Sequence, residues 1–194
     1  DEPLSEKTIL QHHRLISSIL TSAVQWQFII NNPASRVKAP RAEKKEARYF
    51  EEDQVEYIFT LLQDAPIKYR AMIYLSLYGG MRMGELAGLD WSDIDLENNV
   101  LKIKQSSQYL PGEGVFTKET KNYSSLRIIA LPNTVIALMK EYKMWQNGEK
   151  AKLGDLWDKN STRIFTTDHG TPMFPSTPSK WFTKFIKKHN ENIM

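Results

Sequence analysis

The sequence contains no cysteine, which excludes disulfide bonds and thiolate metal sites and fits a reducing cytoplasm. No apolar run reaches the ~18 residues that a membrane-spanning helix needs, and no signal-peptide pattern opens the chain. A P-loop and a cluster of carboxylates at metal-binding spacing are also lacking. The net charge is only +3, so the average composition does not indicate a nucleic-acid-binding protein.

What is present is an ordinary globular composition with an uneven distribution of charge. The 194 residues are 41% hydrophobic and 25% charged, which allows one full domain and a fragment of another. Residues 36–48 contain six Lys or Arg against two Glu, and residues 180–188 contain four Lys and no acid. The chain begins at Asp1 without an initiator methionine, so we expect it to be an excised piece.

The segment 78–95, YGGMRMGELAGLDWSDID, organises the rest of the chain. A nearly all-apolar stretch runs into it and stops at the paired glycines after Tyr78, which end a helix because they tolerate positive φ. A short helix is predicted to begin around Met81, with Leu86 and Leu89 as its buried stripe.

Arg82 and Glu85 are three residues apart on this short helix, so their side chains share one face of its first turn. Free N–H groups make a helix start favourable for anions. An arginine held there by a carboxylate is a fixed, permanently charged fork that suits a phosphate. The alternative is an ordinary surface ion pair of little energetic worth.

The segment GGMRMGELAGLDWSDID resembles the first signature box of the tyrosine recombinases, the phage and transposon integrases. That pattern is a small-residue turn, Arg, two residues, Glu-Leu, and then L-x-W-x-D-I-D. The matching positions are Arg82, Glu85, Leu86, Leu89, Trp91, Asp93, Ile94 and Asp95. A lone R-x-x-E-L is common, whereas the whole pattern after a Gly-Gly turn is specific, and the similarity extends over nearly the entire chain.

The resemblance implies a fold that is mainly α with a small three-stranded antiparallel sheet (α+β), the tyrosine-recombinase catalytic-domain fold truncated at its C-terminus. It makes residues 1–40 a remnant of the helical, SAM-like core-binding domain, residues 41–48 a basic interdomain linker, and residues 49–194 the N-terminal part of the catalytic domain. Periodicity predicts helices over 5–26, 51–62, 67–78, 134–145 and 177–189, and strands over 100–104, 115–118 and 125–131.

The basic segment around Pro40 is predicted to be extended, because it has little apolar surface to bury. It is either a solvated tether or a tether that also contacts phosphates as it crosses a duplex. The resemblance favours DNA contact, and the residues expected to make it are Arg36, Lys38, Arg41, Lys44, Lys45 and Arg48.

In the family, a lysine in the loop before the last strand of the sheet protonates the leaving oxygen. Lys121 matches this position, because it precedes the S-x-R-x-x-x-L-P pattern that begins at Ser125. Lys118 is the competitor, but it is predicted to lie on a strand, where its side chain is pinned, while a loop lysine can reach into a groove. The alternative is that both are ordinary solubilising charges.

Several other polar residues are not assigned to a site. His12 and His13 have no second ligand pair at metal-binding spacing and are interpreted as surface or packing residues, and His169 as a polar turn residue. The family's second box, His-x-x-Arg, and its nucleophilic tyrosine are expected beyond Met194, so this fragment alone is predicted to be inactive. Tyr142 lies upstream of that box and is not interpreted as the nucleophile.

The resemblance implies site-specific DNA recombination through a covalent 3′-phosphotyrosine, with Arg82 stabilising phosphate charge, Glu85 holding Arg82, and Lys121 as general acid. It implies no metal or other cofactor. The expected partners are double-stranded attachment sites, further copies forming a tetramer on DNA, and DNA-bending accessory proteins, in the cytoplasm and without a membrane. The alternatives are a non-enzymatic helical DNA-binding or regulatory protein and an enzyme like the type IB topoisomerases.

Overall fold

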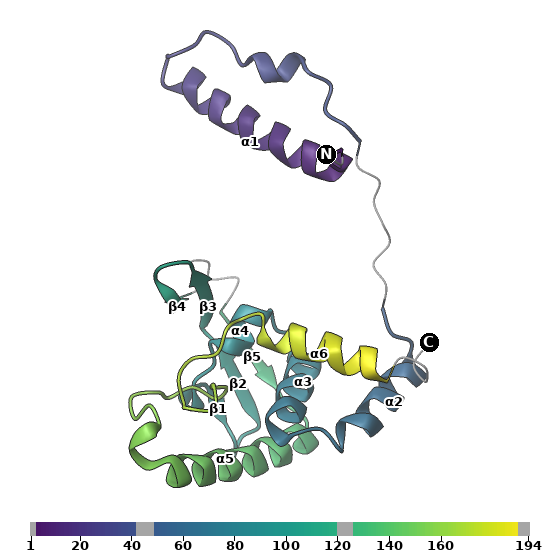
Figure 1. The fold of residues 1–194 in the computed structure, drawn as a ribbon, viewed down its shortest axis with the longest axis vertical. Coiled ribbons are helices and arrows are strands. Elements are labelled where there is room, and N and C mark those ends of the chain that lie inside the picture. The colour runs from purple at the N-terminus through teal and green to yellow at the C-terminus, as the bar shows by residue number, and fades with distance from the viewer. Residues whose placement is uncertain (1–2, 42–48, 120–125, 190–194) are drawn as a thin grey trace. The chain divides into compact units, whose positions relative to one another are not determined.

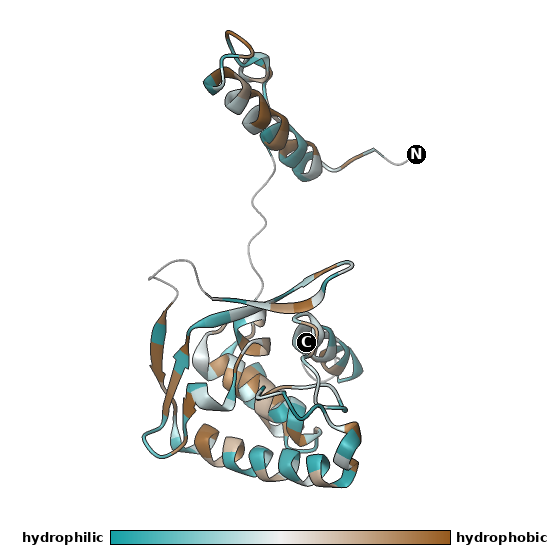
Figure 2. Cartoon of the chain, turned by 90° about the vertical axis from the view of Figure 1, so that its left-hand side faces the viewer, coloured by the Kyte–Doolittle hydropathy of each residue, from teal (hydrophilic) through white to brown (hydrophobic). Residues whose placement is uncertain are grey.

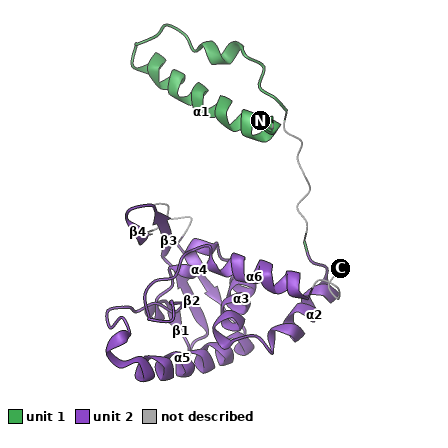
Figure 3. Cartoon of the chain, viewed as in Figure 1, with its two compact units in different colours: residues 1–49 green, residues 50–194 purple. Residues whose placement is uncertain are grey.

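The computed structural model describes residues 3–41, 49–119 and 126–189 (Figure 1). The chain divides into two compact units, Asp1–Tyr49 and Phe50–Met194 (Figure 3), and each is described by itself. Within the described residues, no helix is both long and apolar enough to cross a membrane.

Unit 1 is built around one long helix, α1 (Glu6–Gln25), which begins where the sequence predicts. Ser5 caps it by accepting a hydrogen bond from the backbone N–H of Thr8 (3.2 Å). A short 3-10 turn, η1 (Pro33–Arg36), folds back on α1, where His13 Nε2 and the carbonyl oxygen of Ala34 lie 3.1 Å apart. No residue of α1 is fully buried, and several of its large apolar side chains, including Leu15 and Ile16, are exposed (apolar residues are brown in Figure 2).

Unit 2 is built around α3 (Ile67–Gly79), which is apolar nearly all round, as the sequence predicts for a central helix. Its Met72 and Leu75 are fully buried against Met139 and other residues of α5 (Asn133–Leu153). On the other side, α2 (Glu52–Leu62) and α6 (Thr177–Lys188) complete an aromatic cluster in which Trp181 stacks on Tyr69 at 4.5 Å. Residues of α3 thus belong to both hydrophobic clusters of unit 2.

The main sheet has three antiparallel strands in the order β1-β2-β5, formed by β1 (Ile94–Asp95), β2 (Val100–Ile103) and β5 (Arg127–Ala130). Leu101 pairs with Ile129 in the register of β2 with β5. The inward residues of β2 alternate with exposed ones, and Leu101 and Ile103 enter the core. The fold class predicted from the sequence is therefore confirmed.

The membership of this sheet differs from the sequence prediction. The strand expected over 115–118 is β4 (Gly114–Glu119), which pairs with β3 (Gln105–Leu110) in a separate hairpin. The sequence of β3, QSSQYL, is mostly polar and has no β-branched residue, so its pattern does not indicate a strand. Figure 1 shows the hairpin projecting beside α4 (Met83–Ala87).

The helix predicted over 134–145 is also longer than expected. It continues to Leu153. Gln146, a polar residue just beyond the predicted end, is buried and accepts a hydrogen bond from Trp91 Nε1 (2.7 Å). Its amide group donates in turn to the carbonyl oxygen of Ile164 (2.9 Å). A buried polar group satisfied in this way is invisible to a hydrophobic pattern.

Candidate anion site at the start of α4

The candidate site begins at the turn that ends α3. Gly80 caps the helix in the left-handed conformation (φ 52°), which a residue with a Cβ adopts only with strain. Met81 then turns into the core, and Arg82 becomes the N-cap of α4 with extended backbone angles. The sequence-predicted break between two helices therefore presents the Arg82 side chain at the surface, where it is 77% exposed.

Glu85 holds Arg82 from below. Its carboxylate is only 3% exposed; Oε2 accepts the backbone N–H of Arg82 (3.0 Å), and Oε1 accepts Nη1 of the same residue (3.0 Å). Glu85, at the third helical position, thus caps the backbone N–H of the N-cap residue and holds its side chain as well. The pair is therefore not two exposed side chains in solvent, because its acidic partner is buried.

A second arginine, Arg127 at the start of β5, reaches the same carboxylate from the sheet. Its Nη1 donates to Oε1 of Glu85 (3.2 Å), and its Nη2 donates to Oε2 (2.7 Å) and to the carbonyl oxygen of Gly80 (3.3 Å). Arg127 is not among the site residues predicted from the sequence. The available signal was the need of a buried carboxylate for more donors than one neighbouring arginine supplies.

The charges of this cluster are set by Glu85. Burial opposes ionisation of its carboxyl, but hydrogen bonds from Arg127 and from the backbone and side chain of Arg82 outweigh burial, so the pKa of Glu85 is lowered. Glu85 is therefore ionised at neutral pH. Two guanidinium groups around one carboxylate leave one net positive charge, presented to solvent mainly by Arg82. An exposed guanidinium group can bind two oxygens of one carboxylate or phosphate at once.

The remaining residues of the signature segment support the fold. Leu86 and Leu89 are buried in the main core, and Trp91 anchors α5 through Gln146. Asp93 is buried, accepts the backbone N–H of Asp90 (2.9 Å) and pairs with the Lys104 ammonium (2.6 Å). These contacts fix the chain after α4 and leave Arg82 as the exposed cation of the segment.

The β3–β4 hairpin packs directly against α4. A Cβ on Gly84 would lie 2.8 Å from the carbonyl oxygen of Ser107, and one on Gly88 would lie 2.9 Å from its backbone nitrogen. Gln105 Nε2 donates to the carbonyl oxygen of Gly88 (2.7 Å). Arg163 also donates to that carbonyl and to the hydroxyl of Thr117 on β4. The helix that carries Arg82 and the hairpin thus form one tightly packed piece.

Of the two candidate lysines, Lys118 lies within the described residues and Lys121 does not. Lys118 is an exposed ladder residue of β4, paired with Ser106, and its ammonium lies 5.4 Å from the centre of the Phe116 ring. Lys121 lies outside the described residues. The segment that contains it connects β4, which is fixed to α4 through the hairpin, with β5, which is fixed to Glu85 through Arg127.

Of the predicted DNA contacts, Arg36, Lys38 and Arg41 are exposed in unit 1. In the described part of the chain none of these three forms an ion pair, so their charges are available to an external partner. Lys44, Lys45 and Arg48 lie outside the described residues.

The other polar residues singled out from the sequence are structural. Tyr142 is fully buried, its hydroxyl donates to the carbonyl oxygen of Ile164 (2.9 Å), and burial raises its pKa far above the ordinary value. His169 is an exposed turn residue, as predicted. The histidines, aspartates and glutamates that the structure describes form no group of three or more that could hold a metal ion.

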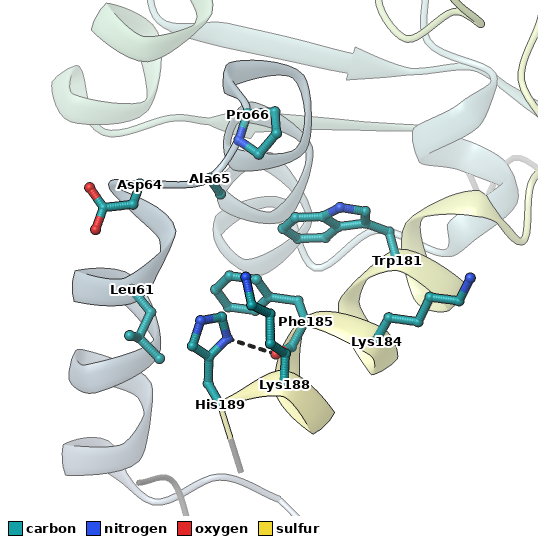
Figure 4. A pocket seen from close by; sticks show the side chains of 9 residues that line it. All are labelled: Leu61, Asp64, Ala65, Pro66, Trp181, Lys184, Phe185, Lys188 and His189. Carbon is teal, nitrogen blue, oxygen red and sulfur yellow. Dashed lines mark hydrogen bonds between the residues drawn. The ribbon is translucent and has the colours of Figure 1, made fainter. Parts of the chain in front are cut away.

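A groove of about 370 Å³ lies between α6 and the α2–α3 corner (Figure 4). The rings of Trp181 and Phe185 face it, with Lys184 and Lys188 on α6 beside them. Arg82, Glu85 and Arg127 do not line this groove. It is therefore separate from the candidate anion site.

Comparison with known proteins decides the family. A sequence model described as the phage integrase family matches residues 48–193, three quarters of the chain. The chain belongs to the phage integrase family.

Its curated relatives include a tyrosine recombinase XerC-like protein of Caldanaerobacter subterraneus subsp. tengcongensis, 26% identical over 95% of this chain and 51% of the relative. The ICEBs1 integrase of Bacillus subtilis is 24% identical over 91% of this chain and 46% of its own length. The chain spans about half the length of these curated relatives.

Solved structures agree on the fold. The Tn1549 transposon integrase in complex with transposon right end DNA matches with a TM-score of 0.77 and 24% identity, over 97% of this chain and 60% of that chain. A lambda integrase tetramer bound to a Holliday junction matches with a TM-score of 0.55 and 20% identity, over 90% of this chain and 43% of that chain. At these identities the likeness establishes the fold of this family member.

Proposed function

We propose that the whole protein is a tyrosine recombinase that cuts and rejoins DNA at specific sites through a covalent 3′-phosphotyrosine intermediate. The observation that carries the proposal is an exposed guanidinium, that of Arg82, held in place by a buried, ionised carboxylate in a member of the phage integrase family. A fixed cation of this kind stabilises charge on a phosphate in the transition state.

In the proposed reaction, a tyrosine hydroxyl gives up its proton to solvent and its oxygen attacks the phosphorus. A phosphotyrosine bond forms while the bond from phosphorus to the 5′-oxygen breaks. The electron pair of that bond goes to the 5′-oxygen, which takes a proton from Lys121. Arg82 stabilises the nonbridging oxygens, and Glu85 holds Arg82 without touching DNA. A 5′-hydroxyl of the partner strand then attacks the phosphotyrosine and releases the tyrosine.

The nucleophile is proposed to be a tyrosine outside this sequence. Tyr142 is unsuitable because its hydroxyl is buried and occupied by the carbonyl oxygen of Ile164. The division into a core-binding remnant at 1–40, a linker at 41–48 and a catalytic part at 49–194 belongs to the same proposal. It is supported by the separate compactness of the two units and by the family match to residues 48–193.

The proposed partners are double-stranded attachment sites, contacted by the basic linker, further copies of the protein forming a tetramer on DNA, and DNA-bending accessory proteins. Arg36, Lys38 and Arg41, which are exposed and form no ion pair with another described residue, support the linker contact. The tetrameric lambda integrase among the structural neighbours supports the assembly, and the ICEBs1 and Tn1549 integrases support a role in a mobile element.

A suicide duplex whose cleaved end diffuses away tests the reaction, since it traps the covalent intermediate. The whole wild-type protein is expected to form a detergent-resistant adduct, and Arg82→Ala is expected to form almost none while keeping most of its DNA affinity. Arg70→Ala, which removes an arginine paired with Glu141 elsewhere in unit 2, is the matched control. DNA binding without any wild-type adduct would favour the non-enzymatic alternative, and relaxation of plasmids without paired sites would favour a topoisomerase.

A further inference from the structure

The carboxylate of Glu85 is saturated with donors. Each of its two oxygens accepts two hydrogen bonds, one from Arg82 and one from Arg127, at distances between 2.7 and 3.2 Å. An ionised carboxylate has about four acceptor positions, so all of them are in use. A buried charge with this degree of satisfaction holds one orientation, because any rotation of the carboxylate breaks several bonds at once.

The two arginines use their guanidinium groups differently. Arg127 turns both terminal nitrogens inward, toward Glu85 and the carbonyl oxygen of Gly80, and its side chain is only 30% exposed. Arg82 gives Glu85 one terminal nitrogen and its backbone N–H, and its side chain is 77% exposed. Arg127 is thus committed to the protein, whereas Arg82 keeps donors available for a ligand.

We propose that Arg127 is a positioning residue that acts through Glu85 to hold the Arg82 guanidinium in the orientation that binds a phosphate. The role rests on the proposed function for its catalytic consequence and on the geometry for its structural one. Arg127 supplies the second positive charge that Glu85 needs, so that Arg82 does not have to turn its remaining donors toward the carboxylate. Its bond to Gly80 also ties the turn before Arg82 to the edge of β5.

Only an arginine fits this role. The bidentate contact of Arg127 spans both carboxylate oxygens, and a lysine ammonium, as a point charge, reaches one of them. Without Arg127, the buried carboxylate keeps a single cation, and the remaining nitrogens of Arg82 become its nearest unused donors. The guanidinium is then drawn inward from the surface position at which it meets DNA.

Unit 2 offers a matched control for loss of an arginine–glutamate pair. Arg70 on α3 pairs with Glu141 on α5, where its Nη2 alone donates to both carboxylate oxygens, each at 3.1 Å. Neither residue contacts Glu85 or Arg82 through any hydrogen bond or ion pair between described residues. Arg70→Met therefore removes a comparable pair from the same unit without touching the candidate site.

The first test needs no catalysis. The backbone amide of Arg82 donates to Glu85. Its ¹⁵N and ¹H NMR chemical shifts, measured against pH in the 194-residue chain, therefore report the titration of that carboxyl. The charged groups hydrogen-bonded to Glu85 in the described residues are Arg82 and Arg127, so Arg127→Met is expected to raise the titration midpoint, whereas Arg70→Met leaves it unchanged. An unchanged midpoint in Arg127→Met would overturn the inference.

The second test measures single-turnover cleavage by the whole protein at saturating DNA. Arg127→Met is expected to slow cleavage by about 10-fold to 100-fold with little change in Kd, since loss of a preorganised donor costs up to ~1,000-fold. Arg127→Lys is expected to be intermediate and serves if the methionine variant does not fold. Arg70→Met should cleave at the wild-type rate.

A double-mutant cycle with Glu85→Gln decides whether Arg127 acts through the carboxylate. If it does, adding Arg127→Met to Glu85→Gln slows cleavage little further. Fully additive losses would overturn the inference, because they would mean that Arg127 contacts DNA itself. Absence of any adduct from the wild-type protein would instead overturn the proposed function, while the amide titration would still decide the positioning role.

Discussion

At the residue scale, the candidate site depends on one buried carboxylate that holds two arginines of different exposure. Removing either arginine side chain would leave the buried Glu85 carboxylate with a single cationic partner, which is costly because a buried charge depends on its partners. The arrangement therefore couples the orientation of Arg82 to the folding of the turn around it. For the proposed role, Arg82 must hold its planar guanidinium group at a fixed position, so that two nitrogens can bind two phosphate oxygens.

Arg82→Lys is expected to lose most of the cleavage activity of the whole protein although it keeps the positive charge. A lysine ammonium does not match two phosphate oxygens at once, and it does not reproduce the contact of Nη1 with Glu85. A loss of about 100-fold or more in the cleavage rate is the scale expected for one preorganised donor. Cleavage of a suicide substrate within a few-fold of wild type would contradict the role of the guanidinium.

Substrates with different leaving groups can show whether Lys121 is the general acid. Lys121→Ala is expected to slow cleavage at an ordinary 5′-oxygen far more than at a 5′-thio substitute, because a departing thiolate needs no proton. Lys118→Ala, which removes an exposed strand residue of the same charge, should show no such rescue. Rescue at Lys118 would place the acid on β4, and rescue at neither would remove this segment from proton transfer.

At the element scale, the short helix α4 is held by the hairpin beside it. The backbone of β3 approaches Gly84 so closely that a methyl group would meet the Ser107 carbonyl oxygen. Because backbone cannot move aside as easily as the end of a flexible side chain, this contact fixes the position of α4 and so of Arg82.

Gly84→Ala is therefore expected to destabilise unit 2 by ~1–3 kcal/mol through overpacking. Gly148→Ala is the control, because Gly148 lies within α5 with no atom within 4 Å of its added Cβ. Alanine there is expected to stabilise by ~0.5–1 kcal/mol, since it lowers the entropy lost on helix formation. Urea unfolding of both variants measures the two effects, and equal signs would contradict the packing account.

The elements that the sequence predicts well are those with a strong apolar pattern. The helix α3, the glycine break after it and the Arg82–Glu85 pair follow from local residues alone. Strand β3 escapes prediction because its residues are polar and gain their structure from a partner strand. Arg127 escapes for a related reason, since its contact with Glu85 joins residues 42 positions apart and no local period reports it.

At the scale of the whole molecule, the two units differ in how much of their apolar side chains they bury. Unit 2 encloses a main core built from α3, α4, α5 and the sheet. In unit 1, α1 buries no residue and leaves large apolar side chains exposed, including Leu15, Ile16 and Ile19. The same unit also carries the exposed cations Arg36, Lys38 and Arg41.

The basic segment is expected to make DNA binding steeply dependent on salt. Contact with about four phosphates gives a log–log salt slope near −3.6, at ~0.9 per phosphate. Replacing Arg36, Lys38 and Arg41 by Gln should flatten the slope by ~2.7, because three contacts are lost. The same charge change at Lys140, Lys150 and Lys152 on α5 is the control and should leave the slope nearly unchanged.

If the triple linker variant keeps the wild-type slope in a titration of labelled duplex, the linker does not contact phosphates. A slope that flattens equally in both triple variants would show that the effect comes from total charge rather than from the linker.

In the proposed reaction Arg82, held by Glu85, neutralises charge on the phosphate that is cut. This role is tested most directly by replacing one nonbridging oxygen of that phosphate with a methyl group, which removes the charge the arginine is needed for. Wild-type whole protein and Arg82→Ala are compared on the phosphodiester and on the neutral methylphosphonate at saturating DNA. Arg82→Ala is expected to cleave the phosphodiester far more slowly than the wild-type protein and to cleave the methylphosphonate at near the wild-type rate. Equal failure of Arg82→Ala on both substrates would contradict this role.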